Sequence, residues 1–160
     1  MRPILPNPPV IIRGAAQGSG SDQFVMTSYY RDGLTGLPEM GIVGDQLWRQ
    51  AGLAPEDVDV AVLYDHFTPF VLIQLEELGF CARGEARHFI ADGAIEIGGR
   101  LPLNPHGGQL GEAYIHGMNG IAEGVRQVRG TAINQVDDVA HVLVTAGTGV
   151  PTSGLILGAA

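Results

Sequence analysis

Short apolar runs of strand length alternate with amphipathic segments of helix length along most of this chain, and this alternation limits the fold more than any other feature. In chain order the pattern predicts a buried strand at 10–16, a helix at 38–51, a strand at 60–64, helices at 69–78 and 110–129, and strands at 139–145 and 154–157. Strands that alternate with helices in this way pair in one sheet and carry the helices on its faces. The sequence therefore predicts an α/β fold. In the helix at 69–78, Gln74 is expected on the wet face, opposite the leucines.

Length, hydropathy and net charge limit the size of the domain and the kinds of surface that it can present. The 160 residues suit one domain with a sizeable core. The mean hydropathy of +0.16 is high for a free-standing domain, and it indicates either a large buried interface or an ordinary apolar α/β core. A net charge of −8 argues against a nucleic-acid-binding surface.

Several other classes of protein are not expected. The chain has no run of eighteen apolar residues, so we expect no membrane span. A basic region followed by an apolar stretch is missing from the N-terminus, so we expect no secretion signal. With Cys81 as its one cysteine the chain forms no internal disulfide, and we expect a cytoplasmic protein.

Unusual residues gather in three turns, each where a predicted strand ends or a helix begins: 64–67 (Tyr-Asp-His-Phe), 104–116 and 145–149. Ligands of open α/β sheets bind beyond the carboxyl ends of the strands, so these turns are expected to converge on one pocket. The histidines lack the spacing of metal ligands, and we expect no metal. The chain contains no lysine, so it has no phosphate-binding loop of the lysine type, and it also lacks a serine-nucleophile elbow.

The central stretch, 104–120, places a glycine pair before a predicted helix. Gly107 and Gly108 can take positive φ and let the backbone lie close to a ligand. The helix start after them directs unpaired N–H groups at any nearby negative charge, and Tyr114 and His116 are expected about two turns into that helix. A phenol holds its proton at neutral pH and acts as a base only beside groups that favour the phenolate. Tyr64 and Tyr114 are therefore either an acid–base pair or two tyrosines that pack with their hydroxyls in water.

The three turns together resemble the C-terminal half of a thiolase. Thiolases carry an Asn-Glu-Ala-Phe turn, a Gly-Gly segment that leads to Gly-His-Pro, and a Cys-x-Gly-x-Gly loop. Here residues 64–67 stand at the first motif, Tyr114 at the position of the thiolase histidine, and Thr145 at the position of the acid–base cysteine. The resemblance implies that residues 1–160 form a thiolase-like C-terminal domain, a layered α/β/α structure with a mixed five-stranded sheet. It also implies that the N-terminal half of the usual two-half fold is missing.

Within the superfamily the chain is most similar to the lipid-transfer-protein branch, related to the thiolase domain of sterol carrier protein, and there to the bacterial steroid side-chain aldolases. Those enzymes use two tyrosines at these positions in steroid (cholesterol) catabolism. The resemblance implies retro-aldol cleavage of a steroid β-hydroxyacyl-CoA to a steroid ketone and propionyl-CoA. It makes Tyr64 and Tyr114 the catalytic acid and base and leaves open which is which, although the position of the thiolase histidine suggests Tyr114 as the base. It requires no cofactor beyond the CoA of the substrate, and it implies a homodimer with an OB-fold partner of the DUF35 type.

The resemblance also suggests residues around the substrate. Backbone N–H groups near Gly147 are expected to form an oxyanion site, by likeness to the thiolase glycine loop. The full set of substrate-binding candidates is Asp65, His66, His106, Gly107, Gly108, His116, Gly147 and Gly149. Two other functions remain open. One is a degenerate thiolase or acyltransferase that uses a cysteine of the missing half, and the other is a non-catalytic module that binds lipid or acyl-CoA.

Overall fold

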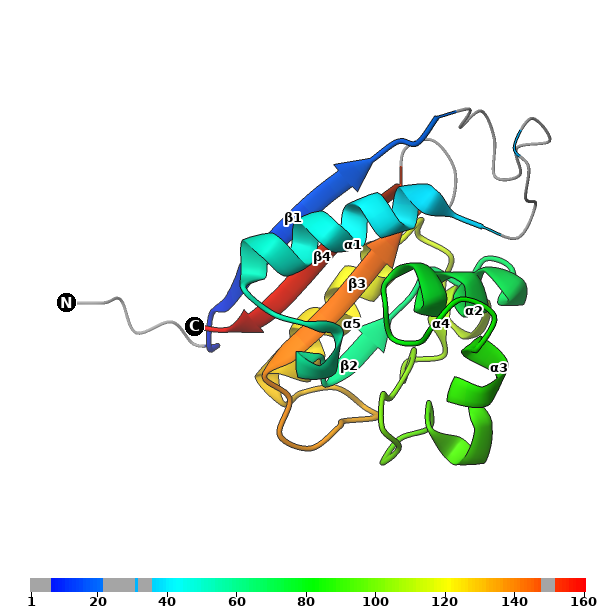
Figure 1. The fold of residues 1–160 in the computed structure, drawn as a ribbon. Coiled ribbons are helices and arrows are strands. Elements are labelled where there is room, and N and C mark those ends of the chain that lie inside the picture. The colour runs from blue at the N-terminus through cyan, green and yellow to red at the C-terminus, as the bar shows by residue number, and fades with distance from the viewer. Residues whose placement is uncertain (1–6, 22–30, 32–35, 148–151) are drawn as a thin grey trace.

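A computed structural model describes residues 7–21, 31, 36–147 and 152–160. In these residues one mixed sheet is formed by β1 (Val10–Gly18), β2 (Val60–Val62), β3 (His141–Ala146) and β4 (Thr152–Ala159), in the spatial order β1-β4-β3-β2 (Figure 1). Strands β2 and β3 are parallel, while β4 runs antiparallel to both of its neighbours. The α/β class and the mixed sheet are confirmed.

The predicted count of five strands is wrong for the described residues, which form four. The position beyond β2 is occupied by a single bridge between Ala61 and Leu103. Ala61 donates to the carbonyl of Pro102 and accepts from the N–H of Asn104. Pro102 has no N–H to donate, and Asn104 has a φ of 48°, outside the range of a strand, so the pairing stops at this one bridge.

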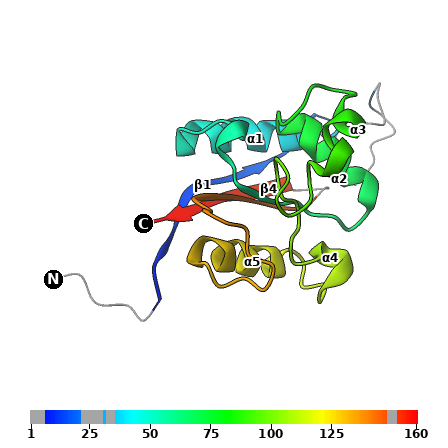
Figure 2. The same cartoon turned by 90° about the horizontal axis from the view of Figure 1, so that it is seen from below.

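Helices cover both faces of the sheet, as Figure 2 shows with the sheet seen edge-on. The helices are α1 (Pro38–Ala51), α2 (Thr68–Glu77), α3 (Ala86–Phe89), α4 (Gly108–Gly111) and α5 (Met118–Arg129), with 3-10 turns at Pro55–Asp57 and Ala91–Gly93. Helix α1 lies on one face and α5 on the other, while α2, α3 and α4 gather beside β2 (Figures 1 and 2). The predicted layered architecture is confirmed. None of the helices in the described segments is long and apolar enough to cross a membrane.

The strands supply apolar side chains to both faces because successive residues of a strand point in opposite directions. Ala61 and Leu143 belong to the core on the α1 side. Val60, Val62, Val142 and Val144 form the second core with residues of α5. Helix α5 approaches closely at Gly124, where an added Cβ would lie 2.9 Å from side-chain carbons of Leu157 and Val144. The central strands are therefore buried on both sides.

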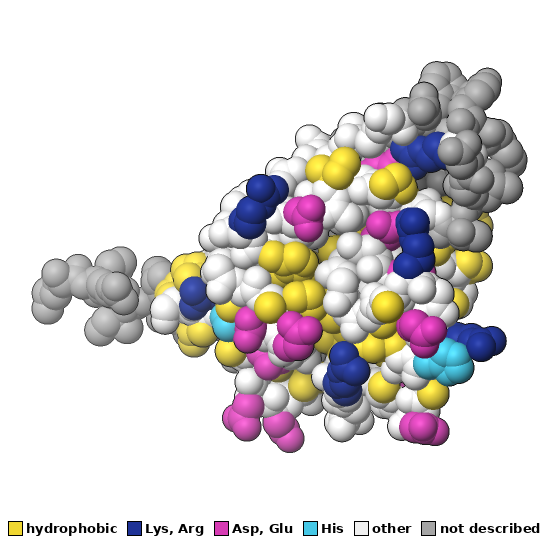
Figure 3. Space-filling model, viewed as in Figure 1, with side chains coloured by type: hydrophobic (Ala, Val, Ile, Leu, Met, Phe, Trp, Pro, Cys, Tyr) yellow, Lys and Arg dark blue, Asp and Glu magenta, His cyan; other side chains and the backbone are white. Residues whose placement is uncertain are grey.

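Strand β1 was predicted to be buried, and that part of the prediction is wrong. It is the edge strand of the described sheet, and Ile12 is 63% exposed. Elsewhere on the surface, apolar side chains gather near the middle of the face shown in Figure 3, with acidic and basic side chains around them.

The predicted single helix at 110–129 is also wrong. Helix α4 ends at Gly111 and α5 begins at Met118, so a loop, residues 112–117, lies between them. His116 and Gly117 have φ of 46° and 92°, which a continuing right-handed helix does not allow. Tyr114 and His116 therefore lie on this loop and not two turns into a helix.

Candidate active site

The three turns lie side by side, and the single pocket expected between them stays a prediction. The backbone N–H of Tyr64 donates to Thr145 Oγ1 at 2.9 Å, which joins the first turn to the third. A Cβ added to Gly117 would lie 3.0 Å from the Cβ of Ala146, so the second turn also reaches the third. Because β2 and β3 are parallel neighbours, their carboxyl ends meet at one edge of the sheet. That edge is the candidate active site.

Two phenolic hydroxyls meet there. Tyr64 Oη and Tyr114 Oη are 2.7 Å apart, a hydrogen bond in which either oxygen can donate. Tyr64 is 8% exposed and Tyr114 is 47% exposed, so the pair runs from the protein interior to the surface. Burial, followed by the hydrogen bond with Tyr114, raises the pKa of Tyr64 to about 12. Tyr64 therefore keeps its proton at neutral pH, and the arrangement favours an acid–base pair over two separate packing tyrosines.

Gln74 is a residue of this site that sequence reasoning missed. It was expected on the wet face of its helix, yet it is fully buried. Its Nε2 donates to the carbonyl of Tyr64 at 2.8 Å, and its Oε1 accepts from Thr145 Oγ1 at 2.6 Å. The one available signal was its place in the chain, four residues after Phe70 and directly before Leu75, among residues that pack inward.

Asp65 and the glycine pair form the second contact between turns. Gly107 and Gly108 have φ of 95° and 66°, which confirms the predicted positive φ at both positions. The Asp65 carboxylate is buried and accepts from the N–H of Gln109 at 2.7 Å. A Cβ on Gly108 would stand 1.9 Å from Asp65 Oδ2. The negative charge at the start of α4 is thus supplied by the chain itself.

Two of the predicted histidines flank the tyrosine pair. The ring centroid of His66 lies 5.0 Å from that of Tyr64, and His66 also stacks near Phe67 and Phe70. Burial lowers the pKa of His66, partly opposed by the charge of Asp65, so its ring is neutral at pH 7. The ring of His116 lies edge-on to Tyr114 with centroids 5.0 Å apart. Each tyrosine ring of the pair is therefore in contact with one histidine ring.

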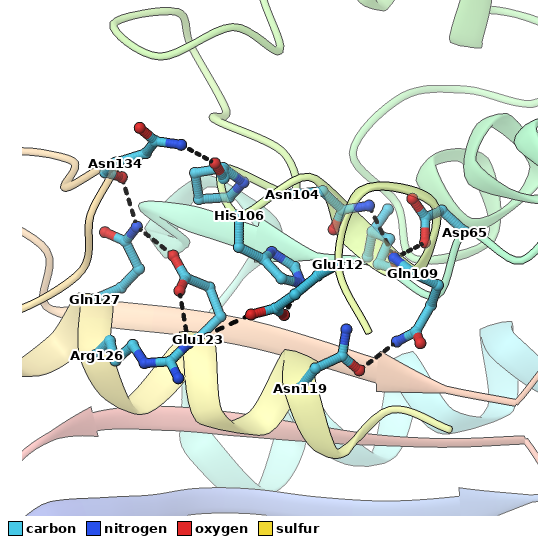
Figure 4. Close-up of polar contacts among 12 residues, drawn as sticks. Asp65, Asn104, His106, Gln109, Glu112, Asn119, Glu123, Arg126, Gln127 and Asn134 are labelled. Carbon is cyan, nitrogen blue, oxygen red and sulfur yellow. Dashed lines mark hydrogen bonds and ion pairs between the residues drawn. The ribbon is translucent and has the colours of Figure 1, made fainter. Parts of the chain in front are cut away.

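His106, the third predicted histidine, contacts a different group of residues. Its buried side chain faces Glu112, with 3.9 Å between His106 Nε2 and the carboxylate (Figure 4). Together with Glu123 and Arg126 of α5 these residues line a cavity of about 280 Å³, and neither tyrosine lines it. His106 is therefore not brought to the hydroxyl pair.

The remaining candidates are glycines of the third turn. Gly147 directly follows β3 with a φ of 74°, and Gly149 lies outside the described residues. The oxyanion site around them stays a prediction. An apolar cavity of about 400 Å³ borders this turn, lined by Thr145, Ala146 and Ser153 and by residues of β1, β4 and α5. In the described part of the chain no three His, Cys, Asp or Glu side chains are grouped to hold a metal ion.

A mixed sheet between two helical layers, with a tyrosine-bearing loop and a threonine turn at the carboxyl ends of its parallel strands, defines a thiolase-like half-domain. The family model described as thiolase C-terminal domain-like matches residues 21–159, and the chain belongs to this family.

Individual relatives show which members of the family the chain is similar to. The chain is 76% identical over 155 residues to a steroid side-chain-cleaving aldolase of Thermomonospora curvata, a match that covers 97% of this chain and 40% of the relative. It is 77% identical over 150 residues to a 17-hydroxy-3-oxo-4-pregnene-20-carboxyl-CoA lyase of Mycobacterium tuberculosis, with coverages of 94% and 39%. The predicted resemblance to the steroid side-chain aldolases is confirmed.

Comparison with solved structures gives the same family and fold. The structure named Ltp2-ChsH2(DUF35) aldolase superposes with a TM-score of 0.95 at 75% identity and covers 98% of this chain and 41% of its own. A monomeric SCP2-thiolase like protein type 1 from Mycobacterium smegmatis has a TM-score of 0.60 at 24% identity, covering 93% and 29%, and shows the shared fold alone. The chain spans about 40% of the length of its curated aldolase and lyase relatives.

Proposed function

We propose that this chain carries the acid–base residues of a carbon–carbon lyase, which cleaves a steroid β-hydroxyacyl-CoA to a steroid ketone and propionyl-CoA. The observation that carries the proposal is the 2.7 Å contact between the hydroxyls of Tyr64 and Tyr114. The names of the two relatives, a steroid side-chain-cleaving aldolase and a steroid carboxyl-CoA lyase, supply the reaction type and the substrate class.

Such a pair can move the protons that this reaction requires. The hydroxyl on the β-carbon gives its proton to the phenolate oxygen of one tyrosine and becomes the ketone as the bond between the α- and β-carbons breaks. The electron pair of that bond passes into the thioester as an enolate. The second phenol then protonates the α-carbon, which leaves propionyl-CoA. The proton taken up equals the proton delivered, and no acyl-enzyme forms, so the chemistry needs no cysteine.

The environment of each phenol supports one assignment of the two roles. Tyr64 is buried, and its pKa is raised to about 12, so it holds its proton and serves as the acid. Tyr114 is the more exposed of the two residues, and we assign it the role of the base. Because the two oxygens are in contact, the proton taken up by Tyr114 returns to Tyr64 along the same hydrogen bond after cleavage.

The surroundings of the pair suit an apolar acyl group. Phe67, Leu110 and Ile115 come from the same turns as the tyrosines, Met118 begins α5 just after them, and each is more than half exposed. Exposed apolar side chains gathered beside a polar reacting pair are typical of a site for a large apolar substrate. We assign them to the steroid, and the backbone near Gly147 to the thioester oxygen.

Thr145 argues against the acyltransferase alternative. Its hydroxyl is buried, donates to Gln74 and accepts from Tyr64, so it is not available as a nucleophile or a proton carrier. We therefore favour the lyase over both alternatives, and we propose that it works as a homodimer with an OB-fold partner of the DUF35 type, the kind named in the aldolase of known structure.

The test is cleavage of a 17-hydroxy steroid carboxyl-CoA in deuterated water by the full-length natural protein, with products identified by mass spectrometry. We expect steroid ketone and propionyl-CoA with one deuterium, placed on one face of C2. Tyr64→Phe should lose this stereospecificity, because solvent then protonates the enolate. Binding without turnover would establish the binding module, and acyl transfer to a second thiol without ketone would establish the acyltransferase.

A further inference from the structure

We propose that Gln74 and Thr145 are positioning residues, which clamp the backbone of Tyr64 so that its hydroxyl meets that of Tyr114. Thr145, at the position of the thiolase acid–base cysteine, then holds Tyr64 in place and does not itself carry a proton. The inference rests on the proposed function, since the placement of Tyr64 matters for turnover only if Tyr64 moves a proton.

Three hydrogen bonds form a closed ring around Tyr64. Its N–H donates to Thr145 Oγ1 at 2.9 Å, and its carbonyl accepts from Gln74 Nε2 at 2.8 Å. Thr145 Oγ1 closes the ring by donating to Gln74 Oε1 at 2.6 Å. The clamp therefore holds both backbone polar groups of one residue, from helix α2 on one side and from strand β3 on the other.

The orientation of the Gln74 amide follows from its partners. Its Nε2 donates both to the carbonyl of Tyr64 and to that of Phe70, at 2.8 and 3.1 Å. A flipped amide would direct its oxygen at two carbonyl oxygens, which cannot donate. The amide oxygen must therefore face Thr145, and the threonine hydroxyl must donate to it. The lone pairs of that hydroxyl are left to accept from the N–H of Tyr64.

Position 145 thus requires one group that donates and accepts at the same time in a water-free place. Gln74 is fully buried and Thr145 is 2% exposed, so water is not available to replace a lost bond. A serine or threonine hydroxyl meets this requirement. A valine has no polar group, and a cysteine thiol donates and accepts only weakly. The clamp explains why a hydroxyl, and not a thiol, suits this position.

The clamp matters for the reaction because it sets the distance between the hydroxyl oxygens of Tyr64 and Tyr114. The ring of Tyr64 has to bring its oxygen to 2.7 Å from Tyr114 Oη. A misplacement of about 1 Å in a catalytic group can cost about 100-fold in rate. The polar groups of Thr145 and Gln74 bond to the backbone of Tyr64 and to each other, so their loss should lower kcat far more than it changes KM.

Four variants of the full-length natural protein test the clamp. Thr145→Val removes the hydroxyl with little change of shape, Thr145→Ser keeps it, and Gln74→Leu removes the amide. Val71→Ala, in the same helix, removes core packing without removing a hydrogen bond to Tyr64. We expect Thr145→Val and Gln74→Leu to lower kcat by about 10- to 100-fold with KM changed less than about threefold.

Stereochemistry separates positioning from general stability. In deuterated water, Thr145→Val and Gln74→Leu should place part of the deuterium on the wrong face of the propionyl group. Thr145→Ser should restore both the rate and the single face. Val71→Ala should lower the unfolding midpoint and keep the wild-type face. A Thr145→Val protein with wild-type kcat and stereochemistry, or a Thr145→Ser protein as impaired as Thr145→Val, would overturn the clamp.

A readout without turnover keeps the clamp distinct from the proposed function. In crystal structures of the variants we expect the Oη–Oη contact of Tyr64 and Tyr114 to open in Thr145→Val and to persist in Thr145→Ser. If the wild-type protein cleaves no β-hydroxyacyl-CoA, the proposed function fails while these structures still test the clamp. A hydrogen bond of unchanged length in both Thr145→Val and Gln74→Leu would refute it.

Discussion

Replacing Gly108 with alanine tests how tightly the first two turns of the site are joined. Gly108 has a φ of 66°, and a Cβ on it would stand 1.9 Å from Oδ2 and 2.6 Å from Cγ of Asp65. The carboxylate is buried, so it cannot move into water without leaving its place at the N–H of Gln109. The alanine must therefore displace Asp65 and break the contact between the turns.

The expected loss of unfolding free energy in Gly108→Ala has two parts. An alanine in the left-handed region costs about 1 kcal/mol. Losing a hydrogen bond to a buried charged group costs about 2–3 kcal/mol. We expect Gly108→Ala to lower the free energy of unfolding by about 3–4 kcal/mol, measured by urea denaturation. Cleavage should fall as well, because Asp65 directly follows Tyr64.

Gly130→Ala is the matched control. Gly130 has a φ of 69°, and an added Cβ meets nothing within 4 Å, so only the backbone strain of about 1 kcal/mol applies. In a protein that already carries Asp65→Ala, the Gly108→Ala change should also cost only about 1 kcal/mol, because the clashing carboxylate is gone. Equal losses for Gly108→Ala and Gly130→Ala in the wild-type background would refute the reasoning.

Two further predictions concern Tyr64 and α5. Folding raises the pKa of Tyr64 to about 12, above the ordinary value of about 10. The resulting stabilisation is complete below about pH 10 and is lost as the pH rises towards about 12. Urea midpoints across this range should therefore fall more steeply for wild type than for Tyr64→Phe, and parallel curves would contradict the shift. Gly124→Ala places a Cβ 2.9 Å from Leu157 and Val144 and should cost about 1–3 kcal/mol of unfolding free energy. Gly111→Ala has open space around it, and it serves as the control, with a change below about 0.5 kcal/mol.

The meeting of the first and third turns was predictable because it depends on the position of two strands alone. Residues 64 and 145 each lie at the carboxyl end of a strand, and β2 and β3 are parallel neighbours, so the two positions must come together. The place of Tyr114 beside them came from the resemblance to thiolases. Helical periodicity did not supply it, because the chain around Tyr114 is a loop.

The features that sequence reasoning missed depend on tertiary contacts. Gln74 reads as a solvent residue because its partners, the backbone of Tyr64 and the hydroxyl of Thr145, are not encoded in the helix. The break before α5 requires a positive φ at His116, a conformation that is uncommon for any residue other than glycine and that helical periodicity does not reveal. The family pattern of five strands does not show that Pro102 and the positive φ of Asn104 limit the fifth to a bridge.

The most direct test of the account is a double-mutant cycle on kcat/KM for cleavage of the steroid β-hydroxyacyl-CoA. Tyr64→Phe and Tyr114→Phe should each lower it by about 100- to 10,000-fold. Because the two hydroxyls pass one proton between them, the double variant should be hardly slower than the slower single variant. Losses that multiply in the double variant, or cleavage that survives both changes, would contradict the claim that the two phenols act as one unit.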